Sequence, residues 1–208
     1  MAESFGIPHV TNYLKQLGLK ISQIDRTRNT VELSFHGEQG KWKLLVGIHQ
    51  SGDASKLMLI VPHFAILTSK KRLECLEALM AINYRIAIGK FGMDPNDGEI
   101  RLEESIPLSN NSISFEQFRL ALSAIMQTVS IYNTLFSRII YGDLSVQDAL
   151  QVCEQEFFVD SDTDQSSTFL TAEQQPQDSQ ELQDDAPSEL DVNEVMAEVA
   201  WLLGRQQD

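Results

Sequence analysis

The chain has 208 residues and a formal net charge of −14, all of which arises after residue 153. Residues 1–153 carry 15 acidic and 15 basic side chains, whereas residues 154–208 carry 15 acidic side chains and one basic side chain, Arg205. A neutral body with an acidic arm disfavours nucleic-acid binding, which needs clustered lysine and arginine. No apolar run approaches the ~20 residues that span a bilayer. The N-terminus also lacks the basic and apolar regions of a signal peptide, so we expect a cytoplasmic protein without membrane contact.

The first half of the body is predicted to form one helix followed by antiparallel strands. A helical stripe ends before Gly18 and consists of Val10, Tyr13, Leu14 and Leu17. A short strand at 21–25 follows, and period-2 alternation then predicts half-buried strands at 31–36 and 42–49. Strand 57–61 is apolar on both faces. It is therefore expected to be central and covered twice, or to lie at an interface.

The second half of the body is predicted to hold two strands between helices. A helix over 69–83 is expected to bury Leu73, Leu76, Leu79 and Met80. Strands at 85–92 and 99–106 are joined by the turn-forming residues 94–98. A long helix over 114–140 then begins at a capping box of Ser114 and Gln117. It carries a second apolar set, Leu120, Ile131 and Leu135, which favours self-association. A shorter helix is expected at 145–158.

The acidic arm divides into two parts with different expected behaviour. Residues 159–187 are rich in Asp, Gln, Ser and Thr without periodicity, which predicts a disordered acidic linker. Residues 188–208 are predicted to contain an amphipathic C-terminal helix. Its stripe consists of Val192, Val195, Met196, Val199, Leu202 and Leu203. The stripe either docks on the chain's own body or serves as a helix-in-groove ligand for another protein. An acidic polar face disfavours a membrane-surface role.

Three consecutive cations, Lys70, Lys71 and Arg72, stand at the predicted start of the second helix. Cations in a first turn oppose the helix macrodipole, at a cost of ~0.3–1 kcal/mol each when exposed. The cluster is either a solvated face or a docking point for acidic segments, and the chain's own arm is the natural candidate. Together with the C-terminal stripe, these residues are the predicted partner-binding set.

The sequence offers no recognisable catalytic, cofactor or metal site. Four histidines lack ligand spacing, and Cys75 and Cys153 are expected to be reduced thiols. The acidic turn at 94–98 resembles a calcium loop, but its glycine stands at position 5 rather than 6, so a hairpin turn is the better interpretation. We therefore expect a chain that is not an enzyme and that needs neither cofactor nor metal.

Several local features together resemble one known family. The helix that leads into Asn83 and Tyr84 is followed by a strand from Gly89 to Gly92, an acidic turn, and Ile106-Pro107-Leu108 before the long helix. This pattern resembles the YbjN domain family, whose fold is similar to that of type III secretion chaperones. The resemblance spans about two thirds of the chain and leaves out the acidic arm. It implies a bacterial sensory-transduction or regulatory role without an established reaction. It also implies dimers that bind partner segments.

The sequence thus predicts an α+β fold in which an antiparallel sheet is packed with helices, in the order helix–strands–helix–two strands–long helix. The expected domains are a YbjN-like body at 1–158, the linker at 159–187 and the C-terminal helix at 188–208. The favoured function is a non-enzymatic protein-binding module, either a regulator or a chaperone-like adaptor, that forms a homodimer. The alternatives are an enzyme with an unrecognised site and a purely self-assembling subunit.

Overall fold

A computed structural model describes residues 5–37, 40–52, 54–108, 112–167 and 190–191 of the chain. Its helices are α1 (Ile7–Gln16), α2 (Arg72–Arg85), α3 (Phe115–Tyr132), α4 (Leu135–Ile140) and α5 (Val146–Ser167). Its strands are β1 (Gln23–Asp25), β2 (Thr30–Gly37), β3 (Gly40–Ser51), β4 (Ala54–Ile66), β5 (Lys90–Met93), β6 (Glu99–Pro107) and β7 (Leu190–Asp191). The order of these elements confirms the predicted α+β arrangement.

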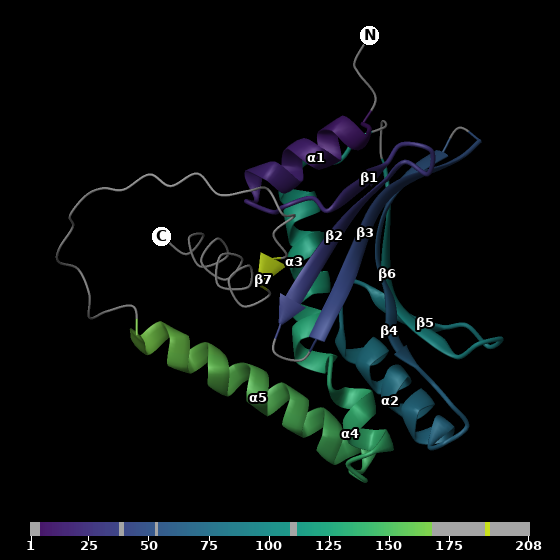
Figure 1. Cartoon of the computed structure of the whole chain (residues 1–208), viewed down its shortest axis with the longest axis vertical. Coiled ribbons are helices and arrows are strands. Elements are labelled where there is room, and N and C mark those ends of the chain that lie inside the picture. Colours follow the sequence, from purple (N-terminus) through teal and green to yellow (C-terminus); the bar gives the residue numbers. More distant parts are fainter. Residues whose placement is uncertain (1–4, 38–39, 53, 109–111, 168–189, 192–208) are drawn as a thin grey trace, which may run out of the picture.

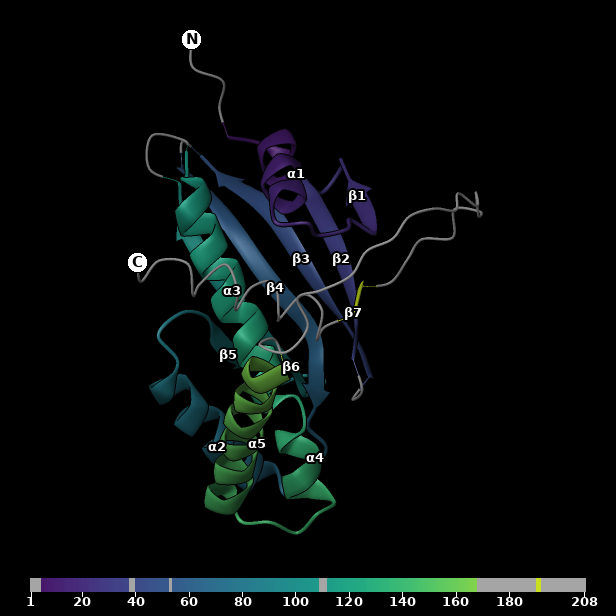
Figure 2. The same ribbon diagram turned by 90° about the vertical axis from the view of Figure 1, so that its left-hand side faces the viewer.

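The strands form a single sheet in the order β1-β2-β3-β4-β6-β5, in which every neighbouring pair is antiparallel. β7 is added to β2 in parallel. Helices α1 and α3 lie against one face of the sheet, and α2, α4 and α5 gather beyond one of its ends (Figures 1 and 2). The chain crosses from β4 to β5 through α2, so α2 is tied to the sheet at both of its ends.

The core lies between the sheet and α3. Alternate residues of the central strands face it and are fully buried, because successive side chains of a strand point to opposite faces. These residues include Val31, Leu33, Phe35, Leu44, Val46, Leu57, Leu59 and Val61. Strand β4 is central, between β3 and β6, as its apolar sequence predicts. On its other face, Met58 and Ile60 are half-buried.

The predicted long helix is wrong in one respect, because it is interrupted after Tyr132. α3 ends there, and α4 begins at Leu135. Around the break, the Ser137 hydroxyl donates to the Thr134 carbonyl oxygen at 2.7 Å, and the Thr134 hydroxyl accepts from Arg138 Nε at 2.9 Å. Hydroxyl side chains that compete for backbone groups weaken a continuous helix. The capping box at the start of α3 is confirmed, with Ser114 and Gln117 bonded reciprocally at 3.1 and 3.2 Å.

Other boundaries also differ from expectation. α2 begins at Arg72 and continues through Arg85, so the following strand starts only at Lys90 rather than at residue 85. α5 continues to Ser167, beyond the boundary expected at residue 158. The rest of the predicted linker lies outside the described residues. So does the predicted C-terminal helix, except for Leu190–Asp191, which form a strand rather than a helix.

Candidate protein-binding surfaces

The end of α2 is fixed to the sheet by Asn83, which belongs to the residues that resemble the family pattern. The Asn83 side-chain amide donates to the Phe91 carbonyl oxygen at 2.9 Å and accepts from the Phe91 N–H at 2.7 Å. Gly89 lies close by with a φ of +81°, where a Cβ would come within 2.7 Å of Ile125 Cδ1. Only glycine fits this combination of backbone angle and close approach. These signature residues therefore serve the structure, and they hold α2 in one orientation.

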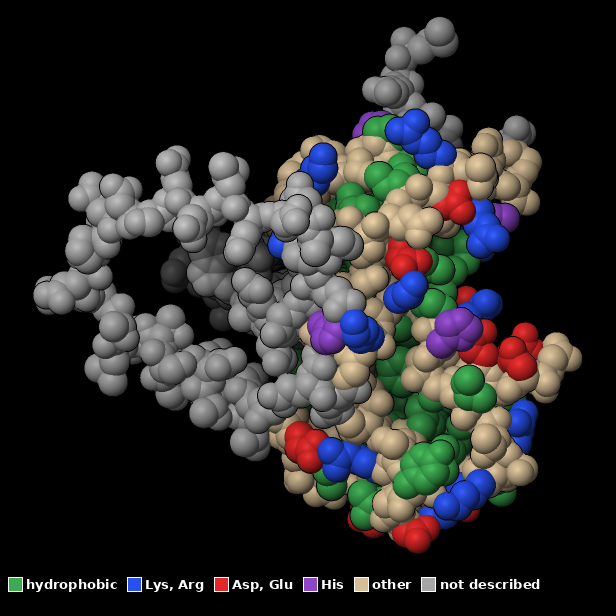
Figure 3. Space-filling view, in the orientation of Figure 1, with side chains coloured by type: hydrophobic (Ala, Val, Ile, Leu, Met, Phe, Trp, Pro, Cys, Tyr) green, Lys and Arg blue, Asp and Glu red, His purple; other side chains and the backbone are tan. Residues whose placement is uncertain are grey.

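The outer face of α2 carries a row of four apolar side chains, three of which the sequence analysis placed in the core. Leu73, Met80 and Tyr84 are 75%, 71% and 93% exposed, and Leu76 between them is half-buried. Figure 3 shows apolar side chains at the surface over this part of the molecule, among charged ones. The side chains that α2 buries are instead Cys75, Ala78, Leu79 and Ile82. We call Leu73, Leu76, Met80 and Tyr84 the α2 row.

The inner side of α2 is held by a polar network with α3 and α5. Glu154 on α5 accepts hydrogen bonds from the Arg85 guanidinium and from the Tyr132 hydroxyl, the latter at 2.9 Å. Burial raises the pKa of Tyr132 to about 12, with a further contribution from the bond to Glu154. A second ion pair joins Arg138 to Glu156 at 2.6 Å. The Arg85–Glu154 contact ties the end of α2 to α5, and the Arg138–Glu156 pair ties α4 to α5.

The positions of Lys70, Lys71 and Arg72 differ from those that the sequence predicted. Only Arg72 lies inside the helix, whose first turn also holds Glu74. Lys71 is the N-cap with a φ of +51°. Lys71 Nζ bonds Asp143 Oδ1 at 2.7 Å, which lowers the pKa of that carboxyl. Lys70 Nζ lies 5.5 Å from the centre of the Tyr141 ring. The prediction that Lys70, Lys71 and Arg72 all lie in the first turn of α2 and oppose its helix macrodipole is therefore wrong. Docking of acidic segments at this place stays a prediction.

The remaining expected contact residues divide between exposed, buried and undescribed positions. Leu120 on α3 is 54% exposed and Ile131 is half-buried, but Leu135 is fully buried within the chain. The C-terminal stripe of Val192, Val195, Met196, Val199, Leu202 and Leu203 lies outside the described residues. Sequence reasoning missed the α2 row because α2 carries two apolar rows. That double pattern is the signal that would have revealed an outward-facing one.

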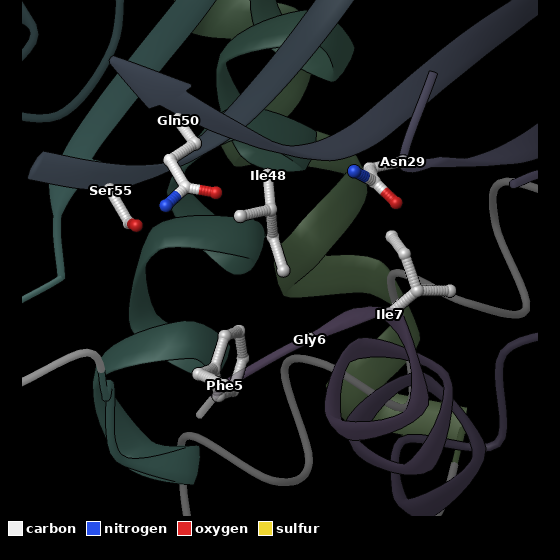
Figure 4. Close-up of a pocket in the computed structure, with 7 residues that line it drawn as sticks. All are labelled: Phe5, Gly6, Ile7, Asn29, Ile48, Gln50 and Ser55. Carbon is white, nitrogen blue, oxygen red and sulfur yellow. The ribbon is translucent and has the colours of Figure 1, made fainter. Parts of the chain in front are cut away.

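Two cavities in the described part of the chain have volumes of about 230 and 200 Å³, and the second is lined by His49, Ser51, Ala54, Ser55, Lys56 and Pro107. One, of about 230 Å³, lies between α1 and the sheet and is lined by Phe5, Gly6, Ile7, Asn29, Ile48, Gln50 and Ser55, none of which is acidic or basic (Figure 4). Ligand pockets are typically ~300–1,000 Å³ with convergent polar groups. No three His, Cys, Asp or Glu side chains gather as a metal site among the described residues. No helix in those ranges combines the length and apolar character needed to cross a membrane.

The fold and its surfaces define a class of protein: an α+β domain with a continuous antiparallel sheet and an exposed apolar helix face. The model of the YbjN family, described as "Putative bacterial sensory transduction regulator", matches residues 9–137. The chain therefore belongs to the YbjN family. This assigns it to a group of bacterial proteins described as regulators, and the family description names no reaction.

The chain can also be compared with individual proteins of known structure. The chain is similar to the crystal structure of YbjN, a putative transcription regulator from E. coli, at 15% sequence identity and a TM-score of 0.39. That similarity covers 57% of this chain and 81% of the other. No curated protein matches the chain.

Proposed function

We propose that this chain is a regulator that acts by binding proteins rather than by catalysing a reaction, and that it forms a homodimer through the α2 row. The observation that carries the proposal is the exposure of Leu73, Met80 and Tyr84, each more than two thirds accessible on one helix face. A contiguous apolar patch on a folded surface is typical of an interaction site. The cavity beside α1 is lined by uncharged residues, and the described residues that line the cavity with His49 and Lys56 include no acidic side chain to pair with them as a catalytic acid or base.

A second copy of the chain is the occupant that fits the α2 row best. Leu76 and Tyr84 stand four residues before and after Met80, so these three positions of the row are symmetric about Met80, and Leu73 lies one turn before them. In an antiparallel pair of α2 helices related by a two-fold axis, Met80 meets its own copy and Leu76 meets Tyr84. Self-complementary patches of this kind are what a two-fold interface requires. Side chains four residues apart also form the ridges through which helices most often pack.

The test is the mass of the full chain in solution, measured by light scattering at tens of micromolar. The expected mass is twice the chain mass of 23.4 kDa. Met80→Asp places two carboxylates on the axis and should raise the dimer dissociation constant at least tenfold. Because Met80 is mostly exposed, this substitution should leave the monomer folded. The matched control is Leu120→Asp on the exposed side of α3, which should not change the mass.

Two outcomes would contradict the proposal. A wild-type chain that is monomeric at this concentration removes the homodimer. If the dimer persists in Met80→Asp but dissociates in Leu120→Asp, the interface lies on α3 rather than on α2.

A further inference from the structure

The edge of the sheet at β2 is only partly covered by β1. The register pairs Gln23, Ile24 and Asp25 of β1 with residues 30–32, whereas β2 continues to Gly37. Residues 33–37 therefore extend beyond β1 along the same edge. An unpaired strand edge is a ready template for another extended segment, because its N–H and C=O groups point sideways.

The direction of these backbone groups follows from one hydrogen bond. The Glu32 carbonyl oxygen accepts from the Ser22 N–H at 2.9 Å, so the backbone groups of Glu32 face the β1 side. In an antiparallel ladder these directions alternate along the strand. Ser34 and His36 therefore also present their N–H and C=O groups to this edge, beyond the end of β1.

Two residues of the C-terminal arm, Leu190 and Asp191, lie at this place. Leu190 pairs with Phe35 and Asp191 with His36, in parallel orientation, so β7 lies along β2 on the side opposite β3 (Figures 1 and 2). This register places residue 190 between Ser34 and His36, the two residues whose backbone groups face outward. Residues 168–189 connect β7 to α5. A chain of that length can span at most about 70 Å, which is enough to connect the end of α5 to the edge of the sheet at β2.

The side chains beside this edge define what it accepts. Phe35, opposite residue 190, faces the core and is stacked on Trp42 with ring centres 4.2 Å apart, which favours an apolar residue in the added strand. On the other face of the sheet, the register sets Lys41 opposite His36 and Lys43 opposite Ser34. Lys43 is already paired with Glu32 of β2 at 2.7 Å, so charges of both signs line this face and the edge sets no charge requirement on the added strand.

We propose that residues 33–37 of β2 form a strand-addition site for an extended segment that places an apolar residue opposite Phe35, and that Leu190–Asp191 of the same chain occupy it. Among the described residues, β7 pairs with Phe35 and His36. A partner segment that bonds the outward N–H and C=O groups of Ser34 and His36 competes with the chain's own arm for the same groups. The arm therefore acts as a tethered competitor, since an intramolecular segment binds at an effective concentration of order millimolar. The site is separate from the α2 row and does not depend on dimer formation.

The first test measures pairing in the full chain by amide hydrogen exchange, followed by NMR. Leu190→Pro removes an N–H from β7, and the matched control Gln183→Pro alters the arm elsewhere. Leu190→Pro should speed exchange of the His36 amide at least tenfold and leave the Glu32 amide, which faces β1, unchanged. Gln183→Pro should change neither amide. Equal exchange of the His36 amide in wild type and Leu190→Pro would overturn the seating of the arm.

The second test measures binding of a fluorescein-labelled peptide of residues 186–197 to the full chain by fluorescence polarisation. The peptide should bind the Leu190→Pro chain at least fivefold more tightly than the wild-type chain. N-methylation of the leucine amide in the peptide should weaken binding about tenfold, because that group can no longer pair with the strand. Absence of binding to Leu190→Pro at 1 mM peptide (on the order of the effective concentration above), or equal binding of the N-methylated peptide, would overturn the site. Neither readout responds to Met80→Asp, so this proposal and the homodimer fail separately.

Discussion

Replacing Asn83 should detach the end of α2 from β5 and destabilise the whole domain. The Asn83 amide satisfies both the N–H and the C=O of Phe91, at 2.7 and 2.9 Å, and Phe91 is itself buried. Asn83→Ala leaves both backbone groups without a partner inside the protein. An unsatisfied buried polar group costs ~1–3 kcal/mol. Partial access of water reduces the sum, so we expect a loss of about 2–4 kcal/mol in the free energy of unfolding.

Urea unfolding followed by Trp42 fluorescence, in chains that also carry Trp201→Phe, measures this loss. With a urea slope of ~1–3 kcal/mol/M, the midpoint should fall by roughly 1–2 M while the slope stays unchanged. Asn83→Asp keeps an acceptor for the Phe91 N–H but sets a carboxylate oxygen against the Phe91 carbonyl. The stability of this variant should therefore lie between that of the wild-type chain and that of Asn83→Ala. The control Asn96→Ala removes an exposed side chain whose amide bonds Asp94 within a turn. It should cost no more than ~0.5 kcal/mol. An Asn83→Ala chain as stable as the Asn96→Ala chain would refute the structural role of this amide.

The remaining predictions concern one glycine and one buried hydroxyl. Gly98→Ala should lower the free energy of unfolding by more than about 2 kcal/mol. A left-handed backbone costs a non-glycine residue ~1 kcal/mol or more. In addition, the added Cβ would lie 2.3 Å from the Leu67 carbonyl oxygen. The control is Gly92→Ala, whose Cβ would meet no atom within 4 Å. Its free energy of unfolding should be within about 0.5 kcal/mol of the wild-type value. Equal urea midpoints for Gly98→Ala and Gly92→Ala would count against the argument. Tyr132 should titrate near pH 12 in the folded chain by ultraviolet absorbance, first because burial disfavours the phenolate and second because of the bond to Glu154. Since the folded pKa exceeds the unfolded value of 10, the neutral hydroxyl contributes stability that is complete below about pH 10 and is lost as the pH rises toward 12. Glu154→Gln should lower the pKa of Tyr132, and an unchanged titration in that variant would show that burial alone sets it.

Local structure could be predicted from the sequence wherever neighbouring residues decide it. The turn between β5 and β6 follows from the side chains of Asp94 and Asp97, each of which accepts from a backbone N–H two residues on. The start of α3 follows from Ser114 and Gln117 in the same way. Alternation of apolar residues identified the strands, and the order of the elements with the family-like residues around Asn83 indicated the fold.

The tertiary structure alone decided which faces are buried and which segments meet. α2 carries two apolar rows, and the one with small residues, Cys75 and Ala78, faces inward, where small side chains let neighbouring elements approach closely. The row with Leu73 and Met80 is left outside and becomes the candidate interface. Pairing of Leu190 with Phe35 joins positions more than 150 residues apart in the sequence. Burial and strand pairing of this kind depend on distant parts of the chain, which no local pattern records.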